Sequence, residues 1–524
     1  MPLVDLPIEI LLLIAEELEF ECDVNSLTQT NAFLYQHLTD YLYRNNVKYF
    51  ESRALLWAAE HGQEATLRRS LAQGADVLTT EKGAVTPLLL ASQFGHTEIV
   101  RLLLSHEDVD PNDWDFDNHT PLSRAAGAGH ADIVKLLLAQ DGIEPNPTDE
   151  GDKTPLDCAA SNGHEAVIKL LLGAKKVRPD LGGADGRASL SYAAEAGHAG
   201  VVKLLLDHGV NPNRRDRDGW TPLTWAAGQG HTEVVKLLLE TKGINPDSVD
   251  GHGRTPLSSA TVYPDIVRLL LDTGKVDPNR KDGIGRTALH WVWHPEAVKM
   301  LLDMDGVDIN STDDCGDTPL SRAVSFGHAE VVNLLIERKG IDMNPRDDMG
   351  RTPLALADWE MAQLLLSKDG VEPNPRDKDG RTPLSRRVSA PETFKVLLDS
   401  DRVDPDCKDD TGRTPLSWAA EEGHLTAIRL LLEKRGVDHN SKDQNGRTPL
   451  SWASGKGYLA AVQILLGTST VDRFSQDNEG HSALWWAETG EHRGVRQALR
   501  ASFLDILRSR NQQEQGQDSG LREE

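Results

Sequence analysis

The chain has 524 residues, with 56 lysines and arginines against 82 aspartates and glutamates, and its formal net charge is −26. Such a surface repels a phosphate backbone, so the composition disfavours nucleic-acid binding. The 4 cysteines lie far apart and form no Cys-x-x-Cys pair, which argues against both a zinc site and a disulfide framework. The apolar stretch Ile8–Leu18 is broken by Glu16 and Glu17. We therefore expect no signal peptide and no membrane span, and a location in the cytoplasm, the nucleus or both.

The first fifty residues are predicted to form three short helices. Pro7 suits the first turn of a helix, because its missing N–H needs no partner there. Apolar residues then follow at helical spacing: Ile8, Leu11, Leu12, Ala15 and Leu18, and further on Phe33, Leu34, Leu38, Tyr41 and Leu42. Three short helices bury too little apolar surface to be stable alone. We expect them to pack on the next segment of the chain or on a partner.

The opening Leu-Pro-x-Glu-Ile, the apolar helix after it and a later leucine resemble an F-box. This resemblance implies that the segment docks a Skp-type adaptor and, through it, a cullin–RING ubiquitin ligase. The matching positions, which the resemblance marks as adaptor-binding residues, are Leu6, Pro7, Ile10 and Leu27. The alternative is that the three helices only cap the segment that follows.

From residue 86 onward the chain returns to a Thr-Pro-Leu-like step every 30 to 34 residues. A fixed period of this size indicates a solenoid, in which each unit contacts only its neighbours. A degenerate further copy begins at Arg53. The other copies begin at Thr86, Thr120, Thr154, Ala188, Thr221, Thr255, Thr287, Thr318, Thr352, Thr382, Thr414, Thr448 and Ser482.

The copy that begins at Thr221 predicts how one unit folds. Thr221 is a natural N-cap, and Pro222 suits the first turn of the helix that follows. Gly228 and Gly230 are expected to end this short helix and to turn the chain.

A second helix is expected over 232–240, with Gly243 as its cap. Its valines and leucines make it apolar on more than one side, so it must be buried between neighbouring units. Asn245-Pro246 and Asp250-Gly251 then predict an extended finger with a tight turn.

The Thr-Pro-Leu, Ala-Ala, Gly-His and Val-Val-Lys-Leu-Leu-Leu elements recur in register over residues 53 to about 500, and they resemble the ankyrin repeat. The resemblance implies an all-α solenoid of helix–turn–helix repeats with β-hairpin-like fingers. Together with its F-box-like opening, the chain resembles the F-box/ankyrin proteins of filamentous fungi. We predict an F-box-like segment over 1–50, an array of about fourteen repeats over 53–505, and a disordered polar tail over 508–524.

Four copies, those that begin at Thr255, Thr287, Thr352 and Thr382, are shorter than the rest. The missing residues lie between the two helices, where the Gly-His turn disappears. One interpretation is tolerated drift in a turn, and the other is an altered rim or bend in the middle of the array.

The chain shows no constellation of residues that indicates catalysis or metal binding. Histidines recur at one repeat position, which predicts a structural role at the turn rather than a ligand or catalytic role. Asp-x-Asp-Gly strings such as 216–219 and 377–380 lack the spaced glutamate of a calcium loop. We therefore predict a non-catalytic protein with no catalytic residues, no metal and no cofactor.

The position four residues after each repeat's first residue forms a stripe that is rich in Trp, Tyr and Arg. In the ankyrin fold this position lies on the first helix, which lines the concave side. These residue types dominate binding hot spots, but aromatic rings also pack readily against a neighbouring repeat, and both roles stay open. The stripe reads Trp57, Leu90, Arg124, Cys158, Tyr192, Trp225, Ser259, Trp291, Arg322, Leu356, Arg386, Trp418, Trp452 and Trp486.

These features predict a protein that binds other proteins. The leading hypothesis is a substrate receptor of a Skp–cullin–F-box ubiquitin ligase, with a target protein on the concave face and fingers. The alternative is an ankyrin scaffold with no ubiquitin role. The expected target-binding residues are Trp225, Trp291, Arg322, Arg386, Trp418, Trp452 and Trp486.

Overall fold

The computed structural model describes residues 40, 41, 43, 44, 46–48 and 52–504. Every named element in this part of the chain is a helix. Its only β pairing consists of two isolated bridges, Glu81–Val85 and Gln476–Ser482. The fingers are thus closed mainly by turns. The chain divides into two compact units, Met1–Asp277 and Pro278–Glu524, which are described separately.

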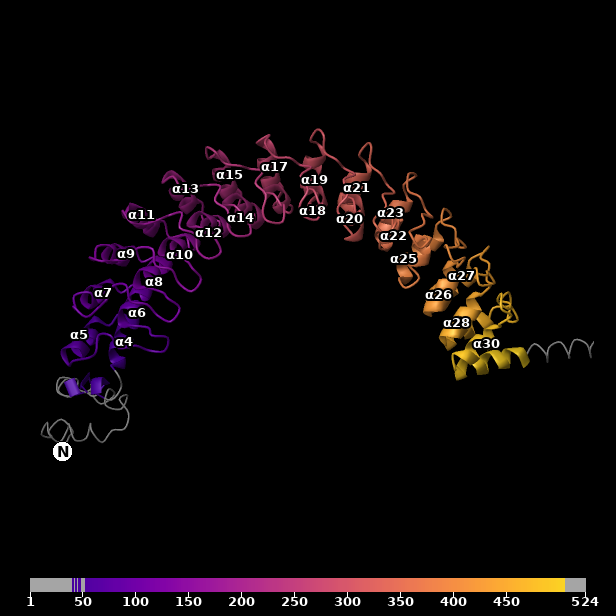
Figure 1. The fold of residues 1–524 in the computed structure, drawn as a ribbon, viewed down its shortest axis with the longest axis horizontal. Coiled ribbons are helices and arrows are strands. Elements are labelled where there is room, and N and C mark those ends of the chain that lie inside the picture. The colour runs from indigo at the N-terminus through magenta and orange to yellow at the C-terminus, as the bar shows by residue number, and fades with distance from the viewer. Residues whose placement is uncertain (1–39, 42, 45, 49–51, 505–524) are drawn as a thin grey trace, which may run out of the picture. The chain divides into compact units, whose positions relative to one another are not determined.

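In the N-terminal unit each repeat is a pair of helices, and Figure 1 shows the first helices and the second helices in two parallel rows. The first helices are α4 (Arg53–His61), α6 (Pro87–Phe94), α8 (Pro121–Ala128), α10 (Pro155–Ser161), α12 (Ser189–Ala196), α14 (Pro222–Gln229) and α16 (Pro256–Ser259). The second helices are α5 (Glu64–Ala72), α7 (Thr97–Leu103), α9 (Ala131–Leu138), α11 (Glu165–Gly173), α13 (Ala199–Asp207), α15 (Thr232–Glu240) and α17 (Pro264–Asp272).

The C-terminal unit repeats the same pairing, and a further helix over 493–504 closes its described part. The first helices are α18 (Ala288–Trp291), α20 (Pro319–Ser325), α22 (Pro353–Leu356), α24 (Pro383–Arg386), α26 (Pro415–Glu422), α28 (Pro449–Lys456) and α30 (Ala483–Thr489). The second helices are α19 (Pro295–Leu302), α21 (Ala329–Ile336), α23 (Trp359–Leu366), α25 (Pro391–Asp399), α27 (Leu425–Glu433) and α29 (Leu459–Leu466).

The repeat that begins at Thr221 folds largely as its sequence predicts. The Thr221 side chain accepts a hydrogen bond from the Thr224 N–H, and Pro222 stands at the first helical position. The prediction that the helix ends at Gly228 is wrong, because α14 continues to Gln229. Only Gly230 adopts the left-handed conformation, with φ 82°, that reverses the chain.

The second helix of this repeat, α15, has the predicted bounds but not the predicted burial on all sides. Val234, Val235 and Leu238 are buried, whereas Leu237 and Leu239 are half-buried. The helix contacts its own first helix and the second helices of its neighbours, and its remaining side faces solvent. Its C-cap is Thr241 rather than Gly243, which lies in the following turn with φ 85°.

The four shortened copies are those that the sequence predicts, but the loss falls within the first helix and not only in the turn between the two helices, where the sequence placed it. Their first helices, α16, α18, α22 and α24, are 4 residues long, and the second helix begins soon afterwards. The first helix of a full-length copy such as α26 has 8 residues. The shortened copies therefore lack the last turn of their first helix and keep the second helix whole.

The fingers are joined by asparagines that bridge each repeat to the next. Asn213, for example, donates to the Gly243 carbonyl at 2.8 Å and accepts from the Asn245 N–H at 2.8 Å. Asn344 makes the same two bonds with Gly370 and Glu372, both at 2.8 Å. The pattern also holds at Asn112, Asn146, Asn279, Asn310, Asn374 and Asn440.

The described residues just before the first repeat are held against it. The Tyr43 hydroxyl donates to Thr66 Oγ1 at 3.1 Å, and Arg44 donates to Gln73 at 3.2 Å. The side chain of Asn46 accepts from the Ala54 N–H at 2.8 Å, at the start of α4. This junction is therefore bonded to the first repeat through side chains.

No helix in the described part of the chain combines the length and the apolar character that crossing a membrane requires.

Candidate functional site

The predicted stripe is tied to the fingers by one recurring hydrogen bond. Trp225 Nε1 donates to Asp216 at 2.9 Å, Trp418 Nε1 to Asp409 at 2.9 Å, and Trp452 Nε1 to Asp443 at 3.0 Å. In each pair the aspartate, which we call the finger aspartate, stands nine residues before the stripe residue. The same bond joins Arg124 to Asp115, Trp291 to Asp282, Arg386 to Asp377, and Trp486 to Asp477.

Each finger aspartate also organises its own turn. One oxygen of Asp409 accepts the N–H groups of Thr411 and Arg413, both at 2.9 Å, while its other oxygen accepts the Trp418 indole. These bonds consume both carboxylate oxygens. The stripe residue and the finger are consequently fixed to one another.

In two of the repeats whose stripe side chain does not make this bond, the finger aspartate takes an arginine as its donor. Ser259 and Leu356 occupy the stripe in these copies. Asp250 then accepts from Arg254 at 2.9 Å, and Asp347 accepts from Arg351 at 2.6 Å. The carboxylate is satisfied in both cases, as a buried charge requires.

Guanidinium groups lie between successive stripe rings and form a tryptophan ladder. The Arg413 guanidinium carbon is 4.4 Å from the Trp418 ring centroid and 4.2 Å from that of Trp452. Arg447 lies 3.6 Å from Trp452 and 3.8 Å from Trp486, and Arg381 lies 3.8 Å from Trp418. Each such contact is worth about 0.5–2 kcal/mol, and here each arginine between two rings couples neighbouring repeats.

The N-terminal unit holds a shorter version of the ladder. Arg187 lies 4.3 Å from the Tyr192 ring and 4.1 Å from the Trp225 ring, and it is paired with Glu195. Lys153 adds a cation 4.8 Å from the Tyr192 ring. Burial lowers the pKa of the ladder arginines Arg381 and Arg447, which stay charged at neutral pH because the ordinary value is so high.

The predicted target-binding residues differ in how much surface they offer. Trp452 is 7% exposed and Arg322 is 8% exposed, so both are buried. The remaining five, Trp225, Trp291, Arg386, Trp418 and Trp486, are half-buried. Arg322 also departs from the common bond, because it donates to the His290 carbonyl at 3.2 Å and its finger aspartate, Asp313, pairs with Arg286.

Sequence reasoning missed the finger aspartates and the ladder arginines as functional partners of the stripe. The signal was present, because eleven of the thirteen copies from residue 86 carry Asp five residues before their first residue. Arginine recurs just before that first residue, as at Arg381, Arg413 and Arg447. The Asp-x-Asp-Gly strings of the sequence are thus turn aspartates that hold the stripe.

Five of the recurring histidines, His96, His130, His164, His198 and His231, serve the turns as their periodicity predicts, whereas His328 and His424 make other contacts. His231 Nε2 donates to the Glu195 carbonyl at 2.7 Å, and His130 donates to that of Gln93 at 3.0 Å. Each ring also covers a left-handed glycine: a Cβ added at Gly95 would come within 2.6 Å of His130. Glycine is required there both by its φ of 86° and by this close approach.

One group of possible metal ligands, Asp115, Asp117 and His119, occurs in the described residues. Asp115 already accepts the backbone N–H groups of Asp117 and His119 and pairs with Arg124. Although burial alone would raise the pKa of Asp115, these donors hold it below its ordinary value. The group serves the finger turn.

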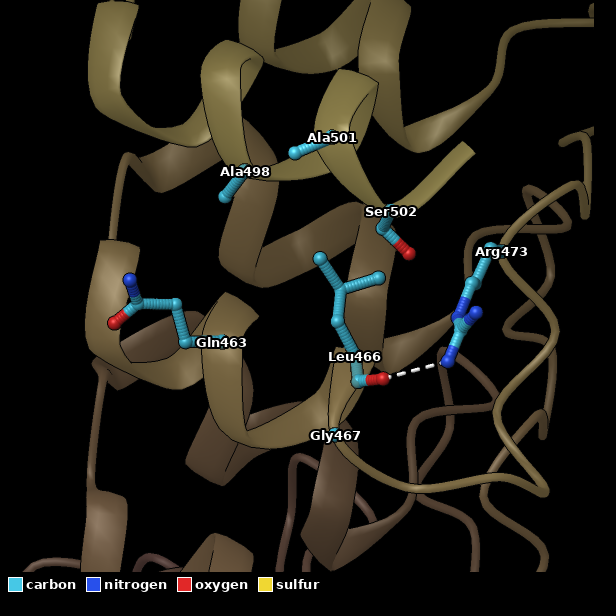
Figure 2. A pocket seen from close by; sticks show the side chains of 7 residues that line it. All are labelled: Gln463, Leu466, Gly467, Arg473, Ala498, Ala501 and Ser502. Atoms are coloured by element: carbon cyan, nitrogen blue, oxygen red, sulfur yellow. Dashed lines mark hydrogen bonds between the residues drawn. The ribbon is translucent and has the colours of Figure 1, made fainter. Parts of the chain in front are cut away.

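Two open pockets lie on the described part of the chain. Figure 2 shows the larger one, about 360 Å³, beside α29, where Arg473 donates to the Leu466 carbonyl at 2.7 Å. Its other polar lining groups are Gln463 and Ser502, and the lining offers no carboxylate, imidazole or thiol for acid–base or nucleophilic chemistry. The second pocket, about 280 Å³, lies between two fingers near Trp114 and Glu144.

The predicted adaptor-binding residues Leu6, Pro7, Ile10 and Leu27 lie outside the described residues. The predicted tail over 508–524 lies outside them as well.

Comparison with known proteins identifies the repeat. A family model described as ankyrin repeats in three copies matches residues 55–149, 144–216, 190–282, 242–313, 293–377, 358–443 and 435–506. Among solved structures, the human ASB11 ankyrin repeat domain is similar, with 27% identity, a TM-score of 0.39, and coverage of 41% of this chain and 96% of that one. A search of curated proteins found no match. Because the family model spans most of its length, the chain belongs to the ankyrin-repeat proteins, which typically bind other proteins and are not catalytic.

Proposed function

We propose that the chain is a substrate receptor of a Skp–cullin–F-box ubiquitin ligase. In this proposal the half-buried stripe residues and the fingers hold a target protein, and the N-terminal segment docks the adaptor. The chain supplies proximity between target and enzyme, and proximity alone lowers a reaction barrier by several kcal/mol. Catalysis belongs to a separate enzyme.

The observation that carries the target-binding part is the rigid setting of the stripe. Trp418 is half-buried, its indole N–H is bonded to Asp409, and its ring lies between Arg381 and Arg413. A side chain held in this way loses little conformational entropy when a partner covers its remaining surface. Tryptophan and arginine are also the residues most enriched in binding hot spots.

The half-buried side chains of the stripe can contact a target, whereas the buried ones can only hold the stripe in place. We infer that Trp225, Trp291, Arg386, Trp418 and Trp486 contact the target. The buried Trp452 and Arg322 then hold the stripe in place from within.

The adaptor-binding part of the proposal rests on the sequence resemblance of the Leu6-Pro7-x-Glu-Ile10 opening. It is tested by titrating a Skp-type adaptor against the full chain and against the double variant Leu6→Ala, Pro7→Ala. The double variant should lose about 2 kcal/mol or more of binding free energy if these residues are hot spots. Unchanged affinity in a folded double variant would contradict the proposal.

The target-binding part is tested on a target first captured by affinity purification with the proteasome inhibited. Trp418→Ala and Trp486→Ala should each lower target affinity by about 2 kcal/mol or more. Denaturant melts run beside the titrations separate binding from folding. Loss of stability with target affinity intact would move recognition from the stripe to the fingers.

The alternative is an ankyrin scaffold with no ubiquitin role, in which the N-terminal helices only cap the repeats. Deletion of residues 1–50 discriminates between the two. A cap predicts a less stable first repeat and no adaptor binding by the full chain. A receptor predicts adaptor binding that the deletion abolishes.

A further inference from the structure

Three consecutive turns between first and second helices in the C-terminal unit carry aromatic side chains. They are the turns after α18 and α20, with Trp293 and Phe326, and the turn after α22, which leads into Trp359 at the start of α23. Phe326 is 60% exposed and Trp359 is 46% exposed. These residues, with His328, Glu330, Asp358 and Glu360, are called the turn patch below.

The patch exists because α18 stops one turn early. In its place the chain runs through Trp293, whose ring lies 5.3 Å from that of Phe326 and 4.6 Å from that of His328. His328 occupies the repeat position from which other histidines bond a carbonyl in the last turn of the preceding first helix. Here that turn is missing, so the imidazole stacks on Trp293 instead.

A buried cation holds the rings in position. The Arg322 guanidinium carbon lies 5.3 Å from the Phe326 ring centroid and 5.7 Å from that of Trp293. Arg322 is 8% exposed and is anchored by its bond to the His290 carbonyl. The aromatic surface is therefore preformed, although more than half of the Phe326 side chain remains in contact with solvent.

The third turn lies directly against the second. A side chain added at Gly327 would come within 3.4 Å of an Asp358 carboxylate oxygen. The other oxygen of Asp358 caps α23 by accepting the Met361 N–H at 2.8 Å. Aromatic and acidic groups thus alternate across adjacent turns.

The charged residues of the three turn segments are all acidic, although Arg322 lies against the rings and Arg387 interacts with the Asp358 carboxylate. Segments 291–296, 325–330 and 355–360 contain four carboxylates and no lysine or arginine, and each segment ends in an exposed glutamate. Glu330 and Glu360 stand in the first turns of α21 and α23. Carboxylates beside exposed aromatic faces attract cations and repel an acidic partner.

We propose that the turn patch docks an extended basic segment of a partner protein, whose arginine or lysine side chains lie against Phe326 and Trp359. This surface shares no residue with the half-buried stripe contacts or the predicted adaptor site. The docking proposal can therefore be tested independently of the proposed receptor function.

The test is fluorescence anisotropy with the full chain and a labelled unstructured peptide of about 15 residues that alternates Arg with Leu and Ser, roughly 50 Å when extended. A second peptide carries Glu at every Arg position. We expect the basic peptide to bind and the acidic one not to bind. Phe326→Ala should weaken binding by about tenfold or more.

Matched variants distinguish the patch from general attraction to an acidic protein. Phe94, 45% exposed at the equivalent position in the N-terminal unit, provides the control Phe94→Ala, which should leave affinity unchanged. Glu330→Lys should weaken binding severalfold more than Glu233→Lys, because Glu233 holds the same position in α15 without an aromatic patch.

Equal affinities for wild type and Phe326→Ala would overturn the proposal, as would equal effects of the two charge reversals. Self-association of the wild type that Phe326→Ala abolishes, without peptide binding, would assign the patch to a second copy of the chain instead.

Discussion

Residues 86–250 and residues 255–399 carry the same repeat with different first helices. In the first region all five first helices, α6 to α14, have 7 or 8 residues. In the second region only α20, with 7 residues, approaches that length, and the other four stop after 4. The fingers do not differ in this way, because asparagine bridges occur on both sides. The two regions therefore differ at the turn side of the repeats.

The missing turn removes a hydrogen-bond acceptor as well as apolar surface. Six histidines lie one repeat after a full-length first helix, and each bonds a carbonyl in the last turn of that helix: His96, His130, His164, His198, His231 and His492. For His328 and His424 the first helix of the preceding repeat is one of the short helices, α18 or α24. His328 stacks on Trp293, and His424 contacts Glu422 at 3.1 Å. One local deletion thus changes the partner of a residue in the next repeat.

The largest effect should come from the stripe, where a buried tryptophan of a full-length copy is compared with a leucine of a shortened one. Trp452→Ala should lower the free energy of unfolding by about 3–5 kcal/mol, because the ring is buried between two guanidinium groups and bonded to Asp443. Leu356→Ala, at the half-buried stripe position of a shortened copy, should cost only about 1 kcal/mol. Denaturant melts of the two variants measure the loss in free energy of unfolding. Equal losses would contradict the greater structural role of the buried stripe tryptophan.

Opposite responses to pH should separate the two regions. Burial raises the pKa of Asp157 to about 6 and lowers the pKa of His290 to about 4. Between pH 7 and pH 4 the folded Asp157 gains a proton before its unfolded form does, so acid stabilises the repeat at Thr154. Over the same range the unfolded His290 gains its proton first, so acid destabilises the repeat at Thr287. Each contribution is of the order of 3 kcal/mol.

Hydrogen exchange followed by mass spectrometry at several pH values resolves the two repeats. Asp157→Ser and His290→Ser supply the controls, because serine occupies the equivalent position in most other copies, including Ser321 and Ser417. Each variant should flatten the pH dependence of its own repeat only. Protection that changes in the same direction in both wild-type repeats would refute this assignment.

A smaller effect should follow from removing the histidine at the turn. His231→Ala loses the 2.7 Å bond to the Glu195 carbonyl and should cost about 1–2 kcal/mol. His424→Ala, in the repeat after a shortened helix, removes only an exposed contact with Glu422 and should cost about 0.5 kcal/mol or less. Chemical denaturation measures the free energy of unfolding of the two variants. A larger loss of stability for His424→Ala would contradict our interpretation that a shortened helix removes the histidine's acceptor.

The smallest effect is a gain in stability. Asp406 takes the place of a bridging asparagine, so it accepts from the Asp438 N–H but has no N–H to donate, and its other oxygen is buried without a partner. Burial raises the pKa of this carboxyl. Asp406→Asn should restore the missing donor and stabilise the C-terminal unit by about 0.5–1.5 kcal/mol. The converse change, Asn440→Asp, should destabilise by a similar amount, and thermal melts compare the two.

Some departures from the repeat pattern explain one another only in three dimensions. Ala188-Ser189 replaces the usual Thr-Pro, and Asp157 replaces the usual serine one repeat earlier. In the structure the Ser189 hydroxyl donates to Asp157, which also accepts the Thr154 N–H and hydroxyl. In the sequence these are two unrelated departures from the repeat pattern. In the structure the two replacement side chains, Ser189 and Asp157, form one buried hydrogen bond between adjacent repeats.

The period, the Thr-Pro helix starts and the four shortened copies are predictable from the sequence, because capping and turn preferences act over a few neighbouring residues. The partners of the stripe and of the histidines depend on how the repeats fold and stack. A stripe indole meets its finger aspartate nine residues away once the finger folds back, and a histidine meets its carbonyl 36 or 37 residues away once two repeats stack. The burial that separates Trp452 from Trp418 arises in the same way, because neighbouring repeats cover some positions more than others.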